Sequence, residues 1–511
     1  MSEMSGVDPI ALSVLRAALE GIAEEMGAAL IRAAYSSNIK ERRDCSAALF
    51  DANGAMVAQA EHIPVHLGAM PEAVAAVIER MPQPGDVFAI NDPYSGGTHL
   101  PDITLVSPLA VDGDIVGYGV TRAHHSDVGG MRPGSMPADS TEIYQEGLII
   151  PPVRLATAEG YVNDVLELIL ANSRTPAIRR ADLRAQIAAN LIGQTRLAEL
   201  VGRRGRDRVL GAFEEVCDYA DRRVREVLRS LPDGTYRAED VMEGDGVTDD
   251  EIPIVAAVTI AGDEMSIDFA GTSDAVAGNV NCPLAVTRSA CYFALRVLLP
   301  DDVPTNAGTY AALAIRAPQG SLVNARPPAA VVAGNVETSQ RIADVVLTAL
   351  AQVAQLPAQG QGTMNNVVIG GPGWTYYETI GGGQGASAEG PGPSGVHVGM
   401  SNTRNTPIEA LELEFPLRIE RYELRAGSGG AGRHRGGDGI VRSVRALEPA
   451  MLSLLTDRRA RGPRGSEGGG DGAPGRNRLN GNDLPAKITR ALETNDVVEI
   501  DTPGGGGWSG T

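Results

Sequence analysis

Three of the seven histidines and five aspartates lie between residues 91 and 130, and such side chains are typical metal ligands. This stretch reads as a strand at Asp86–Asn91, a glycine-rich loop, and a hairpin with strands Asp102–Val111 and Ile115–His124. The turn Asp112-Gly113-Asp114 lies between two apolar runs, which is a strong hairpin signal. The chemistry of the stretch therefore depends on which side chains the hairpin brings together.

Asp102 lies eleven residues before Gly113, and His124 lies eleven residues after it. An odd-length loop centred on Gly113 makes these two residues direct partners with Cβ atoms ~5 Å apart, whereas an even-length loop places them on opposite faces. His99 can fold back from the loop toward the same end of the hairpin. One carboxylate and two imidazoles are a common ligand set for a divalent ion such as Zn, Mn or Fe.

A purely structural interpretation stands beside this one. Asp102 and His124 could hydrogen-bond each other, with His99 at the surface, because H-x-x-D is a weak motif without its structural context. The neighbouring His125 points to the opposite face of the strand, and we expect it to have a structural role.

Other polar residues occur near the same stretch. Asp44 stands where a charged loop enters a short strand, while His62 and His66 precede a helix expected at Pro71–Arg80, where we expect them to be structural. The segment 134–154 is long and irregular but ends in an apolar run. It is expected to cover or line the site. The alternative is a loop that runs over the protein surface without a role in the site.

Composition excludes several classes of protein. The chain has 511 residues, 43% hydrophobic and 21% charged, which is typical of a folded soluble protein. Its formal net charge of −20 argues against nucleic acid and anionic membranes as partners. There is no basic signal-peptide region and no apolar run of about 18 residues. The four cysteines have no C-x-x-C spacing, and we expect reduced thiols in a cytoplasmic protein.

Periodicity predicts a mixed α/β (α+β) protein. Asp8-Pro9 should start a helix that runs to Tyr35, because apolar residues recur at helical spacing. Residues 176–230 should be helical. From Thr235 to about Ala317 strands are expected, interrupted by a buried helix at Val286–Leu299, and a further helix is expected at Glu337–Gln355.

These elements suggest several interlocked lobes. We predict an N-terminal lobe at 1–170 that carries the metal-site hairpin, a helical region at 171–232, an α/β lobe at 233–358 and a glycine-rich β lobe at 359–511. In the last lobe Gly427, Gly429 and Gly432 match G-x-G-x-x-G. No helix pattern follows them, so tight turns between short strands are expected rather than a dinucleotide site.

Common catalytic motifs are missing from the sequence. There is no G-x-x-x-x-G-K-[ST] loop, so a nucleotide used in the reaction is expected on another chain. There is also no G-x-S-x-G and no H-E-x-x-H, the signatures of two common hydrolase mechanisms.

Several stretches resemble the hydantoinase B family, the B-type subunits of ATP-dependent hydantoinases, lactamases and 5-oxoprolinases, which are related to a subunit of acetone and acetophenone carboxylases. The matching stretches cover nearly the whole chain in family order and include HIPVHLGAM, NDPYSGGTHLPDITLVSPL, RAHHSDVGG, STEIYQEGLIIPPVRL, GNVETSQRIADVVLTAL, SNTRNTPIEALELEFP and TPGGGGW. The resemblance implies an A-type partner subunit in a hetero-oligomer. That partner would bind ATP with Mg and phosphorylate the carbonyl oxygen of the substrate.

The resemblance also implies site residues and a reaction. Matched residue by residue, the metal ligands would be Asp44, His99, Asp102 and His124. Asp127 or Glu146 would assist as the base, an assignment made from position only. The implied activity is ring opening of a hydantoin, a lactam or 5-oxoproline. A ketone carboxylase subunit and a metal-binding scaffold that is inert alone are the alternatives.

Overall fold

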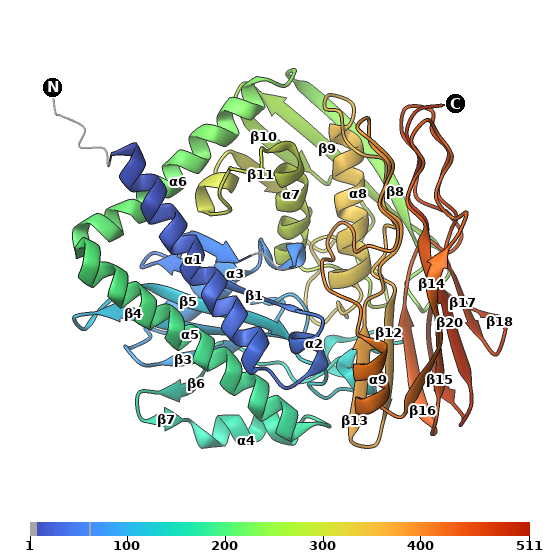
Figure 1. Ribbon diagram of the computed structural model, residues 1–511, viewed down its shortest axis with the longest axis horizontal. Helices are drawn as coiled ribbons and strands as arrows, with labels where there is room; N and C mark the ends of the chain where they lie inside the picture. Colours follow the sequence, from blue (N-terminus) through green and yellow to red (C-terminus); the bar gives the residue numbers. More distant parts are fainter. Residues whose placement is uncertain (1–7, 61–62, 511) are drawn as a thin grey trace.

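The computed structural model describes residues 8–60 and 63–510, and it has the expected mixed α/β architecture (Figure 1). The strands of this part of the chain form four sheets. Helices cover the first two sheets, and the other two lie in the C-terminal third. No helix in the described ranges is long and apolar enough to cross a membrane.

The first sheet has seven strands in the order β2-β1-β5-β4-β3-β6-β7. Its strands are β1 Cys45–Asp51, β2 Met56–Ala60, β3 Val87–Ile90, β4 Asp102–Val111, β5 Asp114–His124, β6 Val153–Thr157 and β7 Gly160–Tyr161. Every paired neighbour in it is antiparallel. Because β4 and β5 lie in the middle of this sheet, both edges of each strand are hydrogen-bonded to a neighbouring strand, which holds the hairpin in place.

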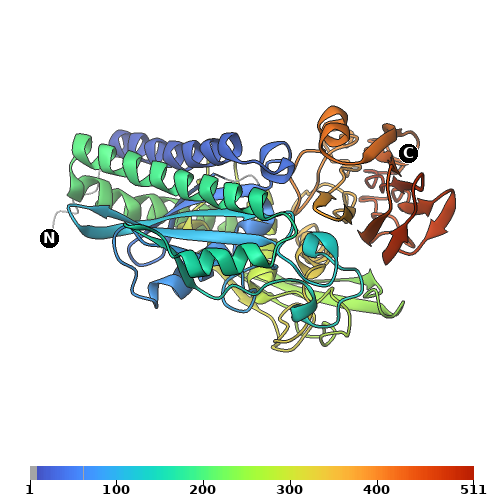
Figure 2. The same cartoon turned by 90° about the horizontal axis from the view of Figure 1, so that it is seen from below.

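Long helices lie side by side over one face of this sheet (Figure 2). They are α1 Pro9–Ala33, α5 Pro176–Arg204 and α6 Arg206–Arg229. The Asp8 carboxylate caps α1 by accepting from the Ile10 amide, which confirms the predicted start of that helix. Shorter helices complete this part: α2 Ser37–Lys40, α3 Met70–Ile78 and α4 Asn163–Ala171.

The central hairpin pairs Asp102 with His124, as predicted, but for a different reason. The turn has two residues, Asp112 and Gly113, both with positive φ, and it pairs Val111 with Asp114. An even loop alone would put Asp102 and His124 on opposite faces. A β-bulge after Leu109 adds one residue to β5 and restores the register.

The second sheet has the order β11-β10-β9-β8 and packs against α8. Its elements are β8 Gly234–Glu243, β9 Glu251–Ala261, β10 Glu264–Asp268, α7 Leu284–Leu298, β11 Leu313–Arg316 and α8 Ser339–Leu350. A hairpin around Gly262 joins β9 and β10, in the region where strands were expected. A π-helical turn, Gly334–Thr338, leads into α8, which therefore starts two residues later than expected.

The C-terminal third forms the two remaining sheets, β13-β12-β16-β19 and β14-β15-β20-β17-β18. Its elements are β12 Asn366–Gly371, β13 Trp374–Glu378, α9 Ile408–Glu414, β14 Leu417–Arg425, β15 Gly439–Ala446, β16 Ala450–Leu455, β17 Arg476–Leu479, β18 Asn482–Leu484, β19 Lys487–Leu492 and β20 Val497–Asp501. Figure 2 shows this third at one end of the molecule.

Two of the three glycines that match G-x-G-x-x-G are explained by close packing rather than by the expected tight turns. Gly427 has a positive φ, as a turn requires, but a Cβ on Gly429 would lie 1.9 Å from the Gly436 carbonyl oxygen. Extended glycine segments lie against one another here, with the Gly505 amide donating to the Gly437 carbonyl at 2.9 Å. The rejection of a dinucleotide site agrees with this arrangement, because no helix follows Gly432.

One hydrophobic core joins all four predicted segments. Its buried members include Phe50 from the first segment, Leu228 from the second, Ile254 from the third and Leu455 from the fourth. The lobes are therefore interlocked, and the boundaries at 170, 232 and 358 stay predictions.

Candidate metal centre

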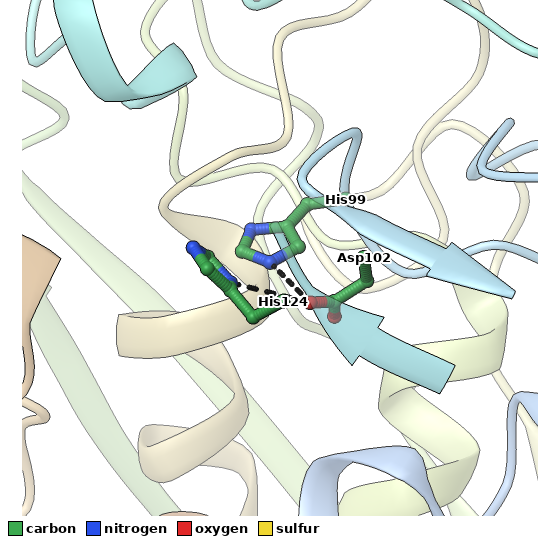
Figure 3. A group of neighbouring side chains, drawn as sticks. All are labelled: His99, Asp102 and His124. Carbon is green, nitrogen blue, oxygen red and sulfur yellow. Dashed lines mark ion pairs between the residues drawn. The ribbon is translucent and has the colours of Figure 1, made fainter. Parts of the chain in front are cut away.

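The open end of the β4–β5 hairpin holds a compact cluster of His99, Asp102 and His124 (Figure 3). His99 Nε2 lies 3.1 Å from Asp102 Oδ1, and His124 Nδ1 lies 3.2 Å from the same oxygen. Thr98 Oγ1 donates to the other oxygen, Oδ2, at 2.6 Å. The loop before β4 thus supplies one imidazole and the paired strand supplies the other, as the sequence predicts.

All three side chains are almost fully buried. Burial alone would raise the pKa of Asp102, but the surrounding histidines outweigh this effect and hold that pKa well below its usual range. Burial lowers the pKa of His124 despite the neighbouring carboxylate. A charged carboxylate beside a neutral imidazole is the protonation state in which both side chains bind a divalent ion.

The cluster fits such an ion. Among the residues that the structure describes, Nδ1 of His99 and Nε2 of His124 are buried without a hydrogen-bond partner. The candidate ligand atoms lie within 4.8 Å of one another. Ligands around a tetrahedral ion at ~2.1 Å stand roughly 3.4 Å apart, close to the two nitrogen–oxygen distances here.

The fourth expected ligand, Asp44, lies on the wall of the same small cavity as Asp102 and His124. Its carbonyl oxygen accepts from the His124 amide at 3.0 Å, and its carboxylate is 3.9 Å from the Arg42 guanidinium. The carboxylate is not part of the close cluster. Three of the four residues are thus brought together, and the fourth faces the same space.

Sequence reasoning missed His66. Its Nε2 lies 3.5 Å from Asp102 Oδ2, and its Nδ1 is 2.9 Å from Ser46 Oγ. His66 is the last residue of a short 3-10 turn, Pro64–His66, that lies before α3. Its side chain contacts the cluster, which was not expected from the sequence. His62, for which a structural role was predicted, lies outside the described residues. The proximity of His66 has no local signal, because it arises from pairing between β1 and β5.

An aromatic stack also fixes the cluster. The Tyr377 ring lies parallel to His124, with centroids 4.2 Å apart, and the Arg42 guanidinium lies over the Tyr377 ring at 4.8 Å from its centroid. Arg42 is fully buried and donates to Thr379 Oγ1 and the Tyr377 carbonyl. Tyr377 and Thr379 are more than 250 residues from the hairpin in sequence, so spacing could not have identified them.

Asp127, suggested as a base from its position, does not line this cavity. One of its oxygens accepts from the Gly129 and Arg174 amides, and the other accepts from the Gly134 amide and the Arg174 side chain. These four donors occupy the carboxylate, which holds the following loop against the start of α5. The carboxylate is thus engaged outside the cavity, and the role of Asp127 as a base stays a prediction that the geometry does not favour.

Glu146 is also buried away from the cavity wall. It accepts from Ser140 Oγ at 3.0 Å and from the amides of Val331 and Val332 at 3.1 Å. Burial raises its pKa to about 7. Glu146 thus holds the chain just before the π-helical turn, and no residue of segment 134–154 lines the cavity.

His125 points away from the cluster, as predicted, with Nε2 2.8 Å from Gln186 Oε1 on α5. The four cysteines are free thiols, and three of them are buried.

Comparison with known proteins gives these features a family context. A model of the family described as hydantoinase B/oxoprolinase matches residues 8–510. The chain is 40% identical to 5-oxoprolinase 1 of Arabidopsis thaliana over 98% of its own length, but this covers only 42% of that protein. The chain thus spans about two fifths of that relative.

Solved structures agree with the observed fold. The ATP-dependent caprolactamase from Pseudomonas jessenii superposes with a TM-score of 0.91 at 31% identity, covering 99% of this chain and 92% of that one. Acetone carboxylase, in a nucleotide-free structure, gives a TM-score of 0.88 at 19% identity, covering 98% and 76%. At this lower identity the likeness concerns the fold alone.

Proposed function

Because this chain belongs to the hydantoinase B/oxoprolinase family, we propose that it is the B-type subunit of an ATP-dependent cyclic-amide hydrolase. The reaction is ring opening of a hydantoin, a lactam or 5-oxoproline. The single observation that carries this proposal is the buried His99–Asp102–His124 cluster, of which Asp102 and His124 line a cavity.

An A-type partner completes the enzyme in this proposal. The chain corresponds to about two fifths of the related plant 5-oxoprolinase and has no phosphate-binding loop motif. A ring amide is a poor electrophile because resonance stabilises its C–N bond. The partner, with ATP and Mg, would phosphorylate the carbonyl oxygen and so provide a leaving group.

The residues of this chain serve the step that follows phosphorylation, in which water attacks the activated amide. His99, Asp102 and His124, with Asp44 beside them, would bind a divalent ion such as Zn, Mn or Fe. When bound, such an ion supplies Lewis acidity and lowers the pKa of water. Tyr377 keeps the His124 ring in one plane by stacking against it. The buried walls exclude bulk water from the activated amide.

Metal content and ring opening together test the proposal. The chain, coexpressed with its A-type partner, is expected to hold near-stoichiometric metal and to open a ring amide at the expense of ATP. Asp102→Ala should lose most of the metal and at least about 100-fold in activity, because it removes a shared ligand. Asp114→Ala, an exposed aspartate on the same hairpin, is the matched control and should change neither value.

Two results would contradict the proposal. The ligand assignment fails if Asp102→Ala keeps both metal and activity. The reaction assignment fails if ATP is consumed only with a ketone and bicarbonate.

A further inference from the structure

A polar side chain outside the cluster faces the same cavity. Asn335 lies on the π-helical turn Gly334–Thr338 and is 3% exposed. It lines the cavity together with Asp102 and His124. Its side-chain oxygen has no hydrogen-bond partner within the described ranges. Leaving a buried amide oxygen unpaired destabilises the fold, so its retention here points to a ligand that supplies the missing donor.

The position of Asn335 is fixed by its surroundings. The Asn279 carbonyl accepts from the amides of Ala333 and Gly334 at 3.0 and 3.1 Å. A Cβ on Gly334 would lie 1.8 Å from the Asn281 carbonyl oxygen, so only glycine fits before Asn335. Glu146 holds the preceding residues from the other side. Single π-helical turns are often found at functional sites, and this one is clamped at its start.

The carboxamide group of Asn335 is suited to bind a particular pattern of hydrogen-bonding groups. It carries an N–H donor and a carbonyl acceptor on one edge, so it can form two parallel hydrogen bonds with a partner that offers the opposite pair. A small lactam ring forces its amide to be cis, which places the ring N–H and C=O side by side. An open-chain amide is trans, and its N–H and C=O point in opposite directions.

We propose that Asn335 is the residue of this subunit that recognises the cis-amide edge of the ring substrate. The inference rests on the proposed function and adds to it a residue that selects cyclic over open-chain amides. The carboxamide suits the activated substrate as well, since its N–H can donate to a ring nitrogen that has lost its proton.

The cavity is small, with about 20 Å³ of free space, which is roughly one water molecule. Binding of a ring at Asn335 therefore requires part of the cavity wall to move. Met364 forms part of that wall, and its unbranched side chain adapts readily to new neighbours.

A matched pair of rings tests this role without turnover. 2-Pyrrolidinone and N-methyl-2-pyrrolidinone differ only at the ring nitrogen, and their binding to the metal-loaded full chain is measured by ligand-observed NMR titration. The wild-type chain should bind the N–H ring about tenfold more tightly, because the methyl group removes one hydrogen bond. Asn335→Ala should bind the two rings equally. Asn335→Leu, which keeps most of the side-chain volume, replaces it if the alanine variant does not fold.

Asn190→Ala is the control. Asn190 is buried and also has an unpartnered side-chain oxygen, but it packs against β4 away from the cavity. This variant should keep the tenfold preference and the metal content of the wild type. The inference would be overturned if Asn335→Ala preferred the N–H ring as strongly as the wild type does. It would also be overturned if the wild-type chain bound neither ring.

Ring opening by the complex separates this inference from the proposed function. If the complex opens no ring but the N–H preference depends on Asn335, the reaction assignment is wrong and the recognition stands. If the complex opens rings but Asn335→Ala keeps the preference, recognition by Asn335 is wrong and the reaction stands.

Discussion

At the residue scale, His66 makes a contact that should hold Asp102 in place. Its ring bridges Ser46 and the Asp102 oxygen that does not face His99. Side chains that orient a metal ligand typically contribute 10–100-fold to metal affinity. We therefore expect His66→Asn to weaken metal binding by about 10-fold or more, measured by competition with a chelator.

Two further variants serve as a comparison and as a control for the effect of His66→Asn. Ser46→Ala should shift the affinity in the same direction by less, because it removes only the support of His66. His434→Ala, in the C-terminal glycine-rich region, should leave it unchanged. Unaltered metal affinity in His66→Asn would rule out the positioning role.

The cluster itself was predictable from sequence, whereas its surroundings were not. His99, Asp102 and His124 lie within one hairpin and its preceding loop, so they are close in sequence and the pairing of the two strands brings them together. Arg42 and Tyr377 come from distant segments, and no spacing rule connects them to His124. For Asp127, its position near the hairpin says nothing of the donors that surround its carboxylate.

At the element scale, the hairpin shows why register is difficult to predict. Gly113 was expected at the centre of an odd loop, but the turn has two residues and the bulge after Leu109 corrects the parity. Both features change the register by one residue, so together they cancel. The pairing of Asp102 with His124 was therefore reached by an incomplete argument.

The π-helical turn carries a second polar residue, Glu337, which makes stability depend on pH. Burial, followed by the charge of Asp457, raises the pKa of Glu337 to about 7, although Thr363, Lys487 and Arg459 oppose the shift. The folded state therefore favours the protonated form. This contribution to stability is fully present below about pH 4.5 and is lost as pH rises through 7.

Glu337→Gln removes that ionisation. The shift corresponds to on the order of 3 kcal/mol, so the melting temperature of the wild type should fall between pH 5 and 7.5 more than that of the variant. Glu389→Gln, at an exposed glutamate, should melt with the same pH profile as the wild type. If the melting temperatures of wild type and Glu337→Gln changed with pH in the same way, Glu337 would not be protonated in the folded state as inferred.

At the scale of the whole molecule, the mixed α/β class followed from periodicity, but the way the lobes join did not. A core that contains Phe50, Leu228, Ile254 and Leu455 depends on contacts between distant parts of the chain. Periodicity within a window shows which face of an element is apolar and not which element covers it. The same limit explains why the glycine-rich third was expected to contain turns between strands.

The glycine segments of the C-terminal third should be intolerant of any side chain. Gly505 donates to the Gly437 carbonyl and accepts from the Gly430 amide, and a Cβ on it would lie 2.0 Å from the Gln384 carbonyl oxygen. Backbone atoms on several sides cannot move aside as a flexible side chain would. Gly505→Ala should thus destabilise the chain by at least about 1–3 kcal/mol, the usual cost of overpacking.

Gly390→Ala provides the comparison, because a Cβ there meets no atom within 4 Å and the backbone conformation suits other residues. Thermal unfolding should show a clear loss for Gly505→Ala and almost none for Gly390→Ala. The loss should leave the metal content of the folded fraction unchanged, since the hairpin cluster lies in another sheet. Equal melting temperatures for the two variants would mean that the glycine segments separate easily and that close packing is not the reason for their composition.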